Sequence, residues 1–354
     1  MSIVIREAEL PADRDILLDT LLRNREHGDQ ALRRARFEWS LACNPYGKPR
    51  AWLAIDESSN KVIGSVSAFP RRVFINGKPA LGWNGADTSI DKAFRTLGVA
   101  MKLRRTVKVC VDRGEMRFLY SHPVDNMRAV LEKIGHVVIG KFARHGVILR
   151  FDRFVNNMVG KNFLAAMLAQ TANPLLRTWS WPGNFLRANG SVVRLQTQNR
   201  FDDEFDALFE RVAKNHPVIS ERNAKFLSWR FLQNPLHREF RIFRLEAENR
   251  LAGYAIVDFA GDGARILDFL VEDRGKDFGT LLAGVIRWLR PKGICSVSVR
   301  ANDHNPALSR LRRFGPTSLD TVNSNIAIHA SADKADRLVL DERNWFMTQA
   351  DRDV

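Results

Sequence analysis

The sequence predicts a mixed α/β protein that consists of two similar halves. Two observations support this prediction: a pair of motifs occurs twice in the same order, and each half shows strands, then a helix, then a further strand. Strands joined by short turns and followed by a helical crossover form a mixed sheet. A chain of 354 residues is long enough for two domains of ordinary size.

The first repeated motif is a Trp, four residues and then Asn-Pro. It occurs at 39–45 (WSLACNP) and at 229–235 (WRFLQNP). Asn-Pro favours a turn and ends a helix, so a helical stretch is expected before each copy, over 12–43 and 203–233. We expect the Trp and Asn-Pro residues to serve packing and turn formation rather than to contact a substrate.

The second repeated motif runs from an Asn to a Gly, at 126–135 (NMRAVLEKIG) and at 305–315 (NPALSRLRRFG). Because both motifs recur in the same order and far apart, the repeated unit is a whole domain. The predicted organisation is a first domain over 1–151, a helical linker over 152–200, a second domain over 201–330 and a tail over 331–354.

Two of these segments have a composition of their own. The linker carries Trp179 and Trp181, which we expect to pack in the seam between the domains. The tail has six acidic and four basic residues, which predicts a solvated segment apart from Trp345-Phe346-Met347.

Apolar runs and turn residues locate the expected elements of each half. Asn76-Gly77 predicts a hairpin turn, and residues 248–250 are expected to join two further strands. The expected strands cover 51–55, 62–69, 73–75, 83–90, 117–121, 137–140, 147–151, 241–245, 252–259, 264–271 and 296–299. The expected helices cover 98–112, 126–134, 280–289 and 306–313.

The composition is that of a globular protein with a basic surface. Hydrophobic residues make up 45% of the chain, which excludes a disordered protein. The 55 Lys and Arg residues outnumber 40 Asp and Glu, for a net charge of +15. The basic residues are scattered, which disfavours a nucleic-acid surface and fits a solvated surface or an anionic cofactor.

Other function classes lack their sequence signals. The three cysteines are far apart and odd in number, which disfavours a disulfide framework and indicates a reducing, cytoplasmic compartment. We expect neither a signal peptide nor a membrane-spanning segment. The sequence shows no Cys/His metal-ligand spacing, no P-loop and no GxSxG elbow, so no metal site is predicted.

The segment that carries chemistry is 87–100 (DTSIDKAFRTLGVA), where a strand runs into a short turn and then a basic helix. The first N–H groups of a helix have no partner within it and carry partial positive charge. Gly98 allows a phosphate to approach, Ala100 leaves the helix start uncrowded, and Arg95 adds a charged donor. The sequence therefore predicts a phosphate-binding cradle at this helix.

This segment resembles the acetyl-CoA motif of the GNAT superfamily of N-acetyltransferases, Arg/Gln-x-x-Gly-x-Gly/Ala, which opens a helix after the fourth strand. Arg95, Gly98 and Ala100 match it residue by residue. The stretch 119–135 is similar to the family's fifth strand and fourth helix. The resemblance covers most of 1–150 and, more weakly, 200–330, and it implies two GNAT-like acyltransferase domains in tandem.

The resemblance also implies the cofactor and its binding residues. The cosubstrate is acetyl-CoA, and main-chain amides at the end of the fourth strand polarise its thioester carbonyl. The cofactor-binding residues so implied are Ser89, Ile90, Arg95, Thr96, Leu97, Gly98, Val99, Ala100 and Asn126.

Two side chains are candidates for acid-base chemistry. Asp87 is the candidate base, because it lies on the strand that leads into the cradle, and an ion pair with a neighbouring Arg is the alternative. His122 is expected near the thioester as a proton relay, and a hydrogen-bonded structural histidine is the alternative. Where the family has an acidic Tyr, this sequence has Val130 and Leu131, so it names no proton donor.

Three further positions depart from the family pattern. Val124 stands at a usual Asn, and His136 replaces a closing aromatic residue. In the second half, 274–279 (RGKDFG) aligns with the cofactor motif but has Asp277 at its middle glycine. A carboxylate there would repel a pyrophosphate, so we expect the first half to bind CoA and the second to be structural or to shape the acceptor site.

Three functions follow from these features. The first is transfer of an acetyl group from acetyl-CoA to an amine of a small molecule or sugar. The second is an acyl or aminoacyl transferase of polysaccharide or envelope assembly. The third is a noncatalytic protein that binds nucleic acid or another anion on the same scaffold. The acceptor, the acyl length and the oligomeric state stay open at this point.

Overall fold

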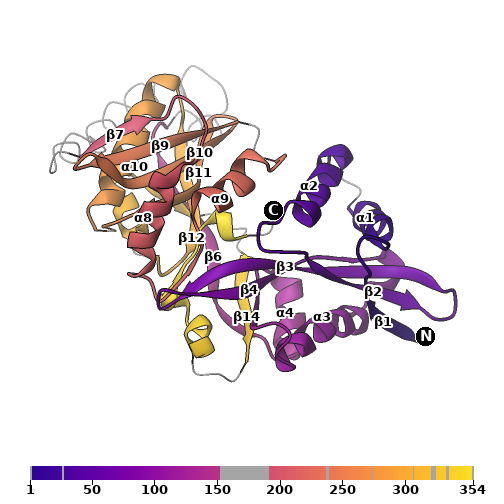
Figure 1. The fold of residues 1–354 in the computed structure, drawn as a ribbon. Coiled ribbons are helices and arrows are strands. Elements are labelled where there is room, and N and C mark those ends of the chain that lie inside the picture. Colours follow the sequence, from indigo (N-terminus) through magenta and orange to yellow (C-terminus); the bar gives the residue numbers. More distant parts are fainter. Residues whose placement is uncertain are drawn as a thin grey trace, which may run out of the picture.

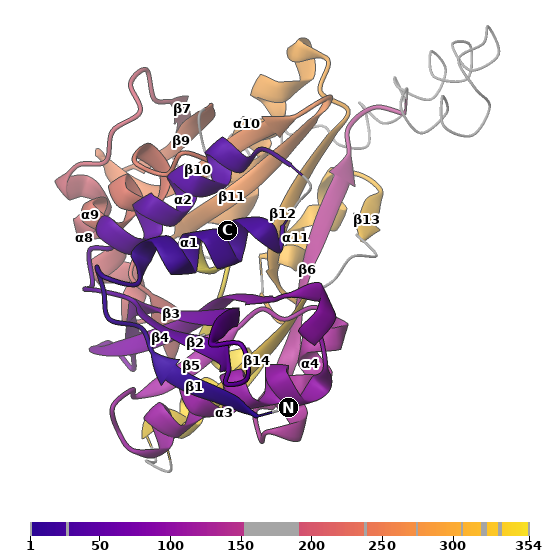
Figure 2. The same cartoon turned by 90° about the vertical axis from the view of Figure 1, so that its right-hand side faces the viewer.

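The computed structural model describes residues 2–25, 28–151, 191–236, 239–273, 275–305, 307–319, 324–331 and 335–352 (Figures 1 and 2). Within these residues, one continuous sheet of 15 strands runs through both halves of the chain. The first half has the elements β1 (Ile3–Glu7), α1 (Arg14–Arg23), α2 (Gln30–Ala42), β2 (Arg50–Asp56), β3 (Lys61–Ile75), β4 (Lys78–Ile90), η1 (Lys92–Phe94), α3 (Leu97–Asp112), β5 (Phe118–Ser121), α4 (Asp125–Lys133) and β6 (Val137–Ile148).

The second half repeats the order of strands, helix, strand, helix and strand. Its elements are β7 (Val192–Leu195), α8 (Asp203–Ala213), β8 (Val218–Ser220), α9 (Ala224–Leu227), the π-helical η2 (Ser228–Leu232), β9 (Phe240–Ala247), β10 (Arg250–Ala260), β11 (Gly263–Val271), α10 (Asp277–Leu289), η3 (Arg290–Lys292), β12 (Ser296–Asn302), α11 (Leu308–Leu311), η4 (Arg312–Phe314), β13 (Thr317–Leu319), β14 (Ser324–Ala330), η5 (Ala335–Leu340), η6 (Glu342–Asn344), β15 (Trp345–Phe346) and η7 (Gln349–Asp351).

Helices cover both faces of the first half. Helices α1 and α2 lie on one side of β2–β4, and α3 and α4 lie on the other (Figure 1). Helix α3 places Val99, Leu103 and Val107 one turn apart on one side, and all three are buried against the sheet. This packing fixes the start of α3 beside the end of β4.

The two halves exchange strands. Strand β14, from the second half, lies between β5 and β6, and β6, from the first half, lies between β12 and β13. The sheet order is β1-β2-β3-β4-β5-β14-β6-β12-β11-β10-β9-β7. Each half therefore completes the sheet of the other.

The repeated Trp residues meet in space. The rings of Trp39 and Trp229 stack with centroids 4.5 Å apart, and Trp39 Nε1 donates to the main-chain oxygen of Trp229 at 3.0 Å. Asn44 and Asn234 each accept a hydrogen bond from the N–H two residues later. The expected roles in packing and turn formation are thus confirmed.

Both expected strand connections are tight turns. Asn76 and Gly77 have φ values of 48° and 72°, which is the signature of a type I′ hairpin turn. Glu248 and Asn249, with φ values of 53° and 59°, form the equivalent turn between β9 and β10. The prediction of a hairpin from Asn-Gly is confirmed.

Several predicted elements differ from the structure. The stretch 12–43 forms two helices rather than one, because Asp29 caps a new helix by accepting from the N–H of Leu32. The stretch 203–233 is interrupted by β8, which pairs with β3 and β15. The segments 62–69 and 73–75 form one strand. The segment 137–140 and the first two residues of 147–151 also form one strand, since continuous pairing spans the polar residues between them.

The expectation of a solvated segment over 331–354 is wrong for its described residues. Val339, Thr348 and Asp351 are buried together with the apolar residues 345–347. Trp179 and Trp181 of the expected linker lie outside the described residues. None of the described helices is long and apolar enough to cross a membrane.

Candidate functional site

The first half of the sheet opens between the parallel strands β4 and β5. These strands pair only at Trp83 with Leu119 and at Asn84 with Tyr120, although β4 continues to Ile90. Beyond this point β4 contains a bulge opposite β3, where the register shifts between Ser65 and Ser67. The end of β4 is therefore free of β5, and its main chain there has one unpaired edge.

Buried polar atoms without hydrogen-bond partners gather at this opening. Among the described residues, Ser89 Oγ, Ser121 Oγ and both ring nitrogens of His122 are buried and make no hydrogen bond. Ser89 lies on β4, and Ser121 and His122 lie at the end of β5. An unsatisfied buried polar group is costly, so such a group at the mouth of an opening indicates a place where a ligand binds.

The start of α3 is open to an approaching anion. Thr96, the N-cap residue, makes no side-chain hydrogen bond to the first turn. A Cβ added at the exposed Gly98 would meet nothing closer than Thr96 Oγ1 at 3.9 Å. Val99 and Ala100 bury their side chains in the core, so only their main-chain groups can face a ligand. Leu97 begins the helix.

The loop between β4 and α3 is fixed by polar contacts to α1. Arg95 Nε donates to the main-chain oxygen of Ile90 at 2.8 Å, and Arg95 Nη2 donates to Asn24 Oδ1 at 3.3 Å. Asp91 pairs with Arg23 at 2.8 Å. Arg95 is also exposed, so it can position the loop and still contribute charge to a bound phosphate.

Asp87 lies in the bulge and forms a buried ion pair. Its φ of 49° is in the left-handed region, which Asp tolerates better than most residues. Arg36 Nη1 lies 2.8 and 2.7 Å from the two carboxylate oxygens, and Arg25 Nη2 lies 3.3 Å from one of them. Both Asp87 and Arg36 are buried. The sequence offered this ion pair as the alternative to a base, and it did not identify Arg36.

His122 follows β5 and packs between aromatic rings. Its ring centroid lies 4.7 Å from that of Phe142 and 5.9 Å from that of Tyr120. Burial and, to a smaller extent, the positive charges of Arg352 and Arg300 together lower the pKa of His122 to about 3, while Asp351 opposes them. The imidazole is therefore neutral at neutral pH.

We expect His122→Gln to reduce the loss of stability on acidification. An unfolded histidine titrates near pH 6.5, so between about 6.5 and 3 the unfolded state binds a proton that the folded state excludes. Stability is present above this window and is lost as pH falls through it, by about 1.4 kcal/mol per pH unit. Urea unfolding of both proteins from pH 7 to 5 measures the difference.

Subtracting the stability of His122→Gln from that of wild type cancels the contributions of the other titrating groups. Burial also lowers the pKa of His136 to about 3, so His136→Gln, on the other side of the fold, is a matched variant with the same expected slope. A difference from wild type that does not change with pH would contradict the assignment.

The remaining predicted site residues lie around α4. Asn126 is exposed in the first turn of α4, which begins after Val124. Val130 and Leu131 are buried in the core, so this helix supplies no acid at those positions. The structure thus gathers the residues of β4, the start of α3 and the end of β5 at one opening, with Asn126 on the helix that follows.

A turn near the end of the chain, residues 348–352, completes this region, and the sequence did not indicate it. The main-chain oxygen of Asp351 accepts from Asn84 Nδ2 at 3.2 Å and from Tyr120 Oη at 3.3 Å. Asn84 and Tyr120 are the last paired residues of β4 and β5. The only local signal was the apolar run 345–347, because the partners of the turn lie more than 200 residues away in sequence.

The equivalent cradle of the second half is closed by a carboxylate. Asp277 Oδ2 accepts from the N–H of Asp273 at 3.0 Å, and Asp273 Oδ1 accepts from the N–H of Gly275 at 2.7 Å. These two carboxylates accept hydrogen bonds from main-chain N–H groups of the loop that precedes α10.

The fold has similar solved structures, although no protein-family model and no curated sequence matches the chain. A GCN5-related N-acetyltransferase from Anabaena variabilis is similar with a TM-score of 0.61 at 12% identity, over 93% of this chain and 73% of that one. A GCN5-related N-acetyltransferase from Kribbella flavida gives 0.59 at 11% identity, over 93% and 71%.

Saccharomyces cerevisiae N-myristoyltransferase with bound myristoyl-CoA gives a TM-score of 0.53 at 12% identity, over 92% of this chain and 79% of that chain. The chain has the GNAT fold. In the GNAT fold of this protein, both the opening between β4 and β5 and the start of α3 fit an acyl-CoA. Two observations support that fit: the buried hydroxyl groups of Ser89 and Ser121 lack hydrogen-bond partners among the described residues, and there is open space at Gly98.

The described residues show no sign of a metal site. No group of three or more His, Cys, Asp or Glu side chains is placed to hold a metal ion within them. Cys43, Cys110 and Cys295 are free thiols. Burial raises the pKa of the Cys110 thiol to about 11, so this cysteine is not a thiolate nucleophile at neutral pH.

Proposed function

We propose that this protein is an acyl-CoA-dependent N-acyltransferase that moves an acetyl group from acetyl-CoA to an amine of a small molecule or sugar. The observation that carries the proposal is the opening between β4 and β5, with unpartnered buried polar atoms beside an uncapped helix start. The GNAT fold supports an acyl-CoA as the cosubstrate.

In the proposed reaction the neutral amine nitrogen attacks the thioester carbonyl carbon. The C–S bond breaks, the amide forms, and the thiolate of CoA leaves with a proton supplied from the site. Main-chain N–H groups of Ser89 and Ile90 would stabilise the negative charge that develops on the carbonyl oxygen. N–H groups at the start of α3, with Arg95, would hold the pyrophosphate.

His122 and Asp87 are the proposed proton-handling groups. Both ring nitrogens of His122 lack a hydrogen-bond partner among the described residues. Because its pKa is about 3, His122 would not hold a proton at neutral pH, and its proposed role is a relay in which one ring nitrogen receives a proton as the other releases one. Asp87 would act at longer range, because Arg36 holds both of its oxygens. We propose the reducing cytoplasm as the compartment, which the three free thiols support.

Free-thiol release from acetyl-CoA across a panel of amines tests the proposal. We expect release above the hydrolysis background with at least one primary amine, and saturation with both substrates. Absence of thiol release with every amine, together with absence of CoA binding by calorimetry, would contradict the proposed function.

The Asp87→Asn variant tests whether Asp87 acts as a catalytic base or only supports the structure. Removing the charge leaves Arg36 buried without its anion, so we expect a loss of about 3–5 kcal/mol in stability. We expect the double variant Asp87→Asn/Arg36→Gln to recover much of that stability. If its thiol-release rate also recovers, Asp87 is a positioning residue; if the rate stays low across pH, the role as base is supported.

A further inference from the structure

The two copies of the repeated Trp and Asn-Pro motif differ in how their side-chain donors are satisfied. In the first copy, Trp39 Nε1 donates to the main-chain oxygen of Trp229 at 3.0 Å, and Asn44 Nδ2 donates to the main-chain oxygen of Pro70 at 3.3 Å. In the second copy, Trp229 Nε1 and Asn234 Nδ2 are buried and have no hydrogen-bond partner among the described residues. The same two donor groups are therefore satisfied in one half and left over in the other.

Packing and turn formation do not use the two leftover donors. Trp39 stacks on the ring of Trp229 at 4.5 Å and the Arg71 guanidinium lies over the same ring at 4.6 Å, so a ligand can meet only the ring edge that carries Nε1. Asn234 Oδ1 accepts from the N–H of Leu236 at 3.0 Å and forms the turn, which leaves the Nδ2 amide. Trp229 and Asn234 are each only 2% exposed. A buried donor without an acceptor is costly, which indicates that a bound molecule supplies the acceptor.

The backbone of the second copy also differs from that of the first. Element η2 is π-helical, and the N–H of Gln233 donates to the main-chain oxygen of Ser228, five residues earlier, at 3.0 Å. Trp229 and Asn234 are five residues apart as well, so one such wide turn separates the two donors. In the first copy, Trp39 lies in the regular helix α2. Single π-helical turns are frequent at functional sites, so this turn is a second indication of a ligand.

The second copy lies beside the opening between β4 and β5. Arg230, next to Trp229, donates to the main-chain oxygens of Gln349 and Arg352 at 3.2 and 2.9 Å. These two residues belong to the 348–352 turn, which also accepts hydrogen bonds from the last paired residues of β4 and β5. The turn therefore connects the second copy of the motif to the opening.

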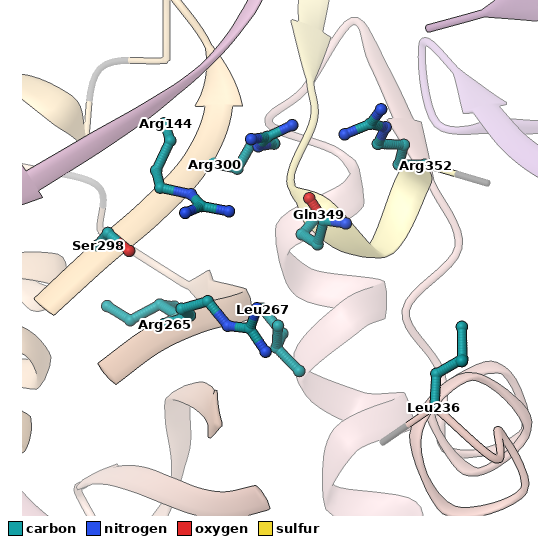
Figure 3. A pocket seen from close by; sticks show the side chains of 9 residues that line it. Arg144, Leu236, Arg265, Leu267, Ser298, Arg300, Gln349 and Arg352 are labelled. Atoms are coloured by element: carbon teal, nitrogen blue, oxygen red, sulfur yellow. The ribbon is translucent and has the colours of Figure 1, made fainter. Parts of the chain in front are cut away.

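A cavity of about 250 Å³ at the same place has room for a small molecule (Figure 3). Its wall includes Gln349 and Arg352 of the turn, together with Leu236, whose N–H is held by Asn234. Figure 3 shows Gln349 and Arg352 near one another, with Leu236 farther along the wall. The cavity thus adjoins both the Asn-Pro turn of the second copy and the turn that contacts the opening.

We propose that Trp229 and Asn234 bind a hydroxyl oxygen of the acceptor, so that the acceptor is an amine that also carries a hydroxyl group, as an amino alcohol or an amino sugar does. The inference rests on the proposed acyltransferase function and names its acceptor class. The indole and amide N–H groups are uncharged donors, which suit an uncharged oxygen. A hydroxyl oxygen has two lone pairs and can accept from both groups.

Matched acceptor pairs test this inference through thiol release. Ethanolamine is compared with propylamine and glucosamine with cyclohexylamine, and kcat/KM is calculated on the concentration of the neutral amine. We expect kcat/KM to be at least about 10-fold higher for the hydroxylated member of at least one pair. Equal values within both pairs, or a preference confined to β-alanine over propylamine, would overturn the inference and leave the acyltransferase function standing.

Equal substitutions in the two copies locate the selectivity. Trp229→Phe removes the leftover N–H and keeps an aromatic ring in the stack, and Trp39→Phe is its matched control. We expect Trp229→Phe to raise KM for the hydroxylated acceptor about 10-fold, with KM for acetyl-CoA and for the amine without a hydroxyl unchanged. Asn234→Ala and Asn44→Ala each lose the hydrogen bond of their turn, and only Asn234→Ala is expected to raise this KM. An equal rise in both copies would overturn the assignment.

Stability distinguishes a ligand-binding donor from a structural one. Trp229→Phe and Trp39→Phe lose the same ring atoms, but only Trp39→Phe loses a hydrogen bond within the described protein. We therefore expect the urea midpoint of ligand-free Trp39→Phe to be lower than that of ligand-free Trp229→Phe. Equal midpoints would mean that the Trp229 N–H is already satisfied inside the folded protein, for example by an enclosed water, and would overturn the inference.

Direct binding keeps the test independent of catalysis. Calorimetry with glucosamine, without acetyl-CoA, is expected to show binding to wild type and to Trp39→Phe, and binding at least about 10-fold weaker to Trp229→Phe. If no amine releases thiol but this pattern holds, the proposed function fails and the hydroxyl site stands. Equal binding by all three proteins, or binding by none of them, would overturn the site.

Discussion

Gly98→Asp is expected to weaken acetyl-CoA binding by at least about 100-fold without destabilising the protein. The substitution places a carboxylate in the first turn of α3, where the proposed pyrophosphate would lie. Two charges of like sign at contact distance near a protein surface repel by several kcal/mol, and about 2.7 kcal/mol already corresponds to 100-fold. The second half of this chain carries an Asp at the equivalent position, Asp277.

The same substitution should leave the fold unharmed. Gly98 is exposed and a Cβ there has open space, since its nearest neighbour would be 3.9 Å away. An acidic side chain in the first turn also interacts favourably with the helix dipole. We therefore expect the urea midpoint to stay constant or rise, while calorimetry shows the loss of CoA binding.

Two variants serve as controls for Gly98→Asp. Gly98→Ala adds a Cβ without charge and separates steric from electrostatic effects. Asp277→Asn changes the corresponding position of the second half and is expected to leave CoA affinity unchanged. Normal CoA binding by Gly98→Asp would show that the cradle is not at α3.

Local patterns in the sequence were enough to predict the elements that surround the cradle. Helix α3, strand β11 and the Asn76-Gly77 hairpin lie within a few residues of their predicted bounds. Each depends on contacts between near neighbours: the apolar stripe of α3, the apolar run of β11, and the positive φ that Asn and Gly allow. Residues 87–100 lie together at one end of the sheet because the end of β4 and the start of α3 are close in sequence.

Long-range pairing was not predictable from those patterns. Strand β14 joins β5 and β6 across about 200 residues of sequence, with Ala327 paired to Ser121 and Ser324 to Phe142. The sequence predicts β6 as two pieces because its centre, around Arg144, is polar, whereas pairing with β12 and β14 keeps it one strand. The ion pair of Asp87 with Arg36 has no sequence signal for the same reason.

Arg222→Met is expected to lower the free energy of unfolding by about 3–5 kcal/mol. Arg222 is fully buried and pairs with two carboxylates, Asp268 at 3.1 Å and Asp351 at 2.5 Å. Thr348 and Tyr254 also donate to Asp268. Removing the guanidinium leaves two buried carboxylates without their cation, which costs far more than the loss of one contact.

This variant is also expected to lower acyl transfer, because the 348–352 turn touches the opening. The carboxylate of Asp351 is held by Arg222, and its main-chain oxygen is held by Asn84 and Tyr120 at the last paired residues of β4 and β5. A loosened turn would displace the edge of the opening at Asn84 and Tyr120. We expect kcat/KM for an acceptor to fall under conditions in which the variant is still folded.

Urea unfolding of three proteins measures the effect. Arg343→Met, which removes an exposed pair, should change stability by less than about 0.5 kcal/mol. Arg222→Met/Asp268→Asn/Asp351→Asn neutralises the carboxylates and should recover part of the loss, since the repulsion and the uncompensated charges are gone. A cost below about 1 kcal/mol for Arg222→Met would mean that the turn is held by its apolar residues instead, and activity would then be expected to survive in all three proteins.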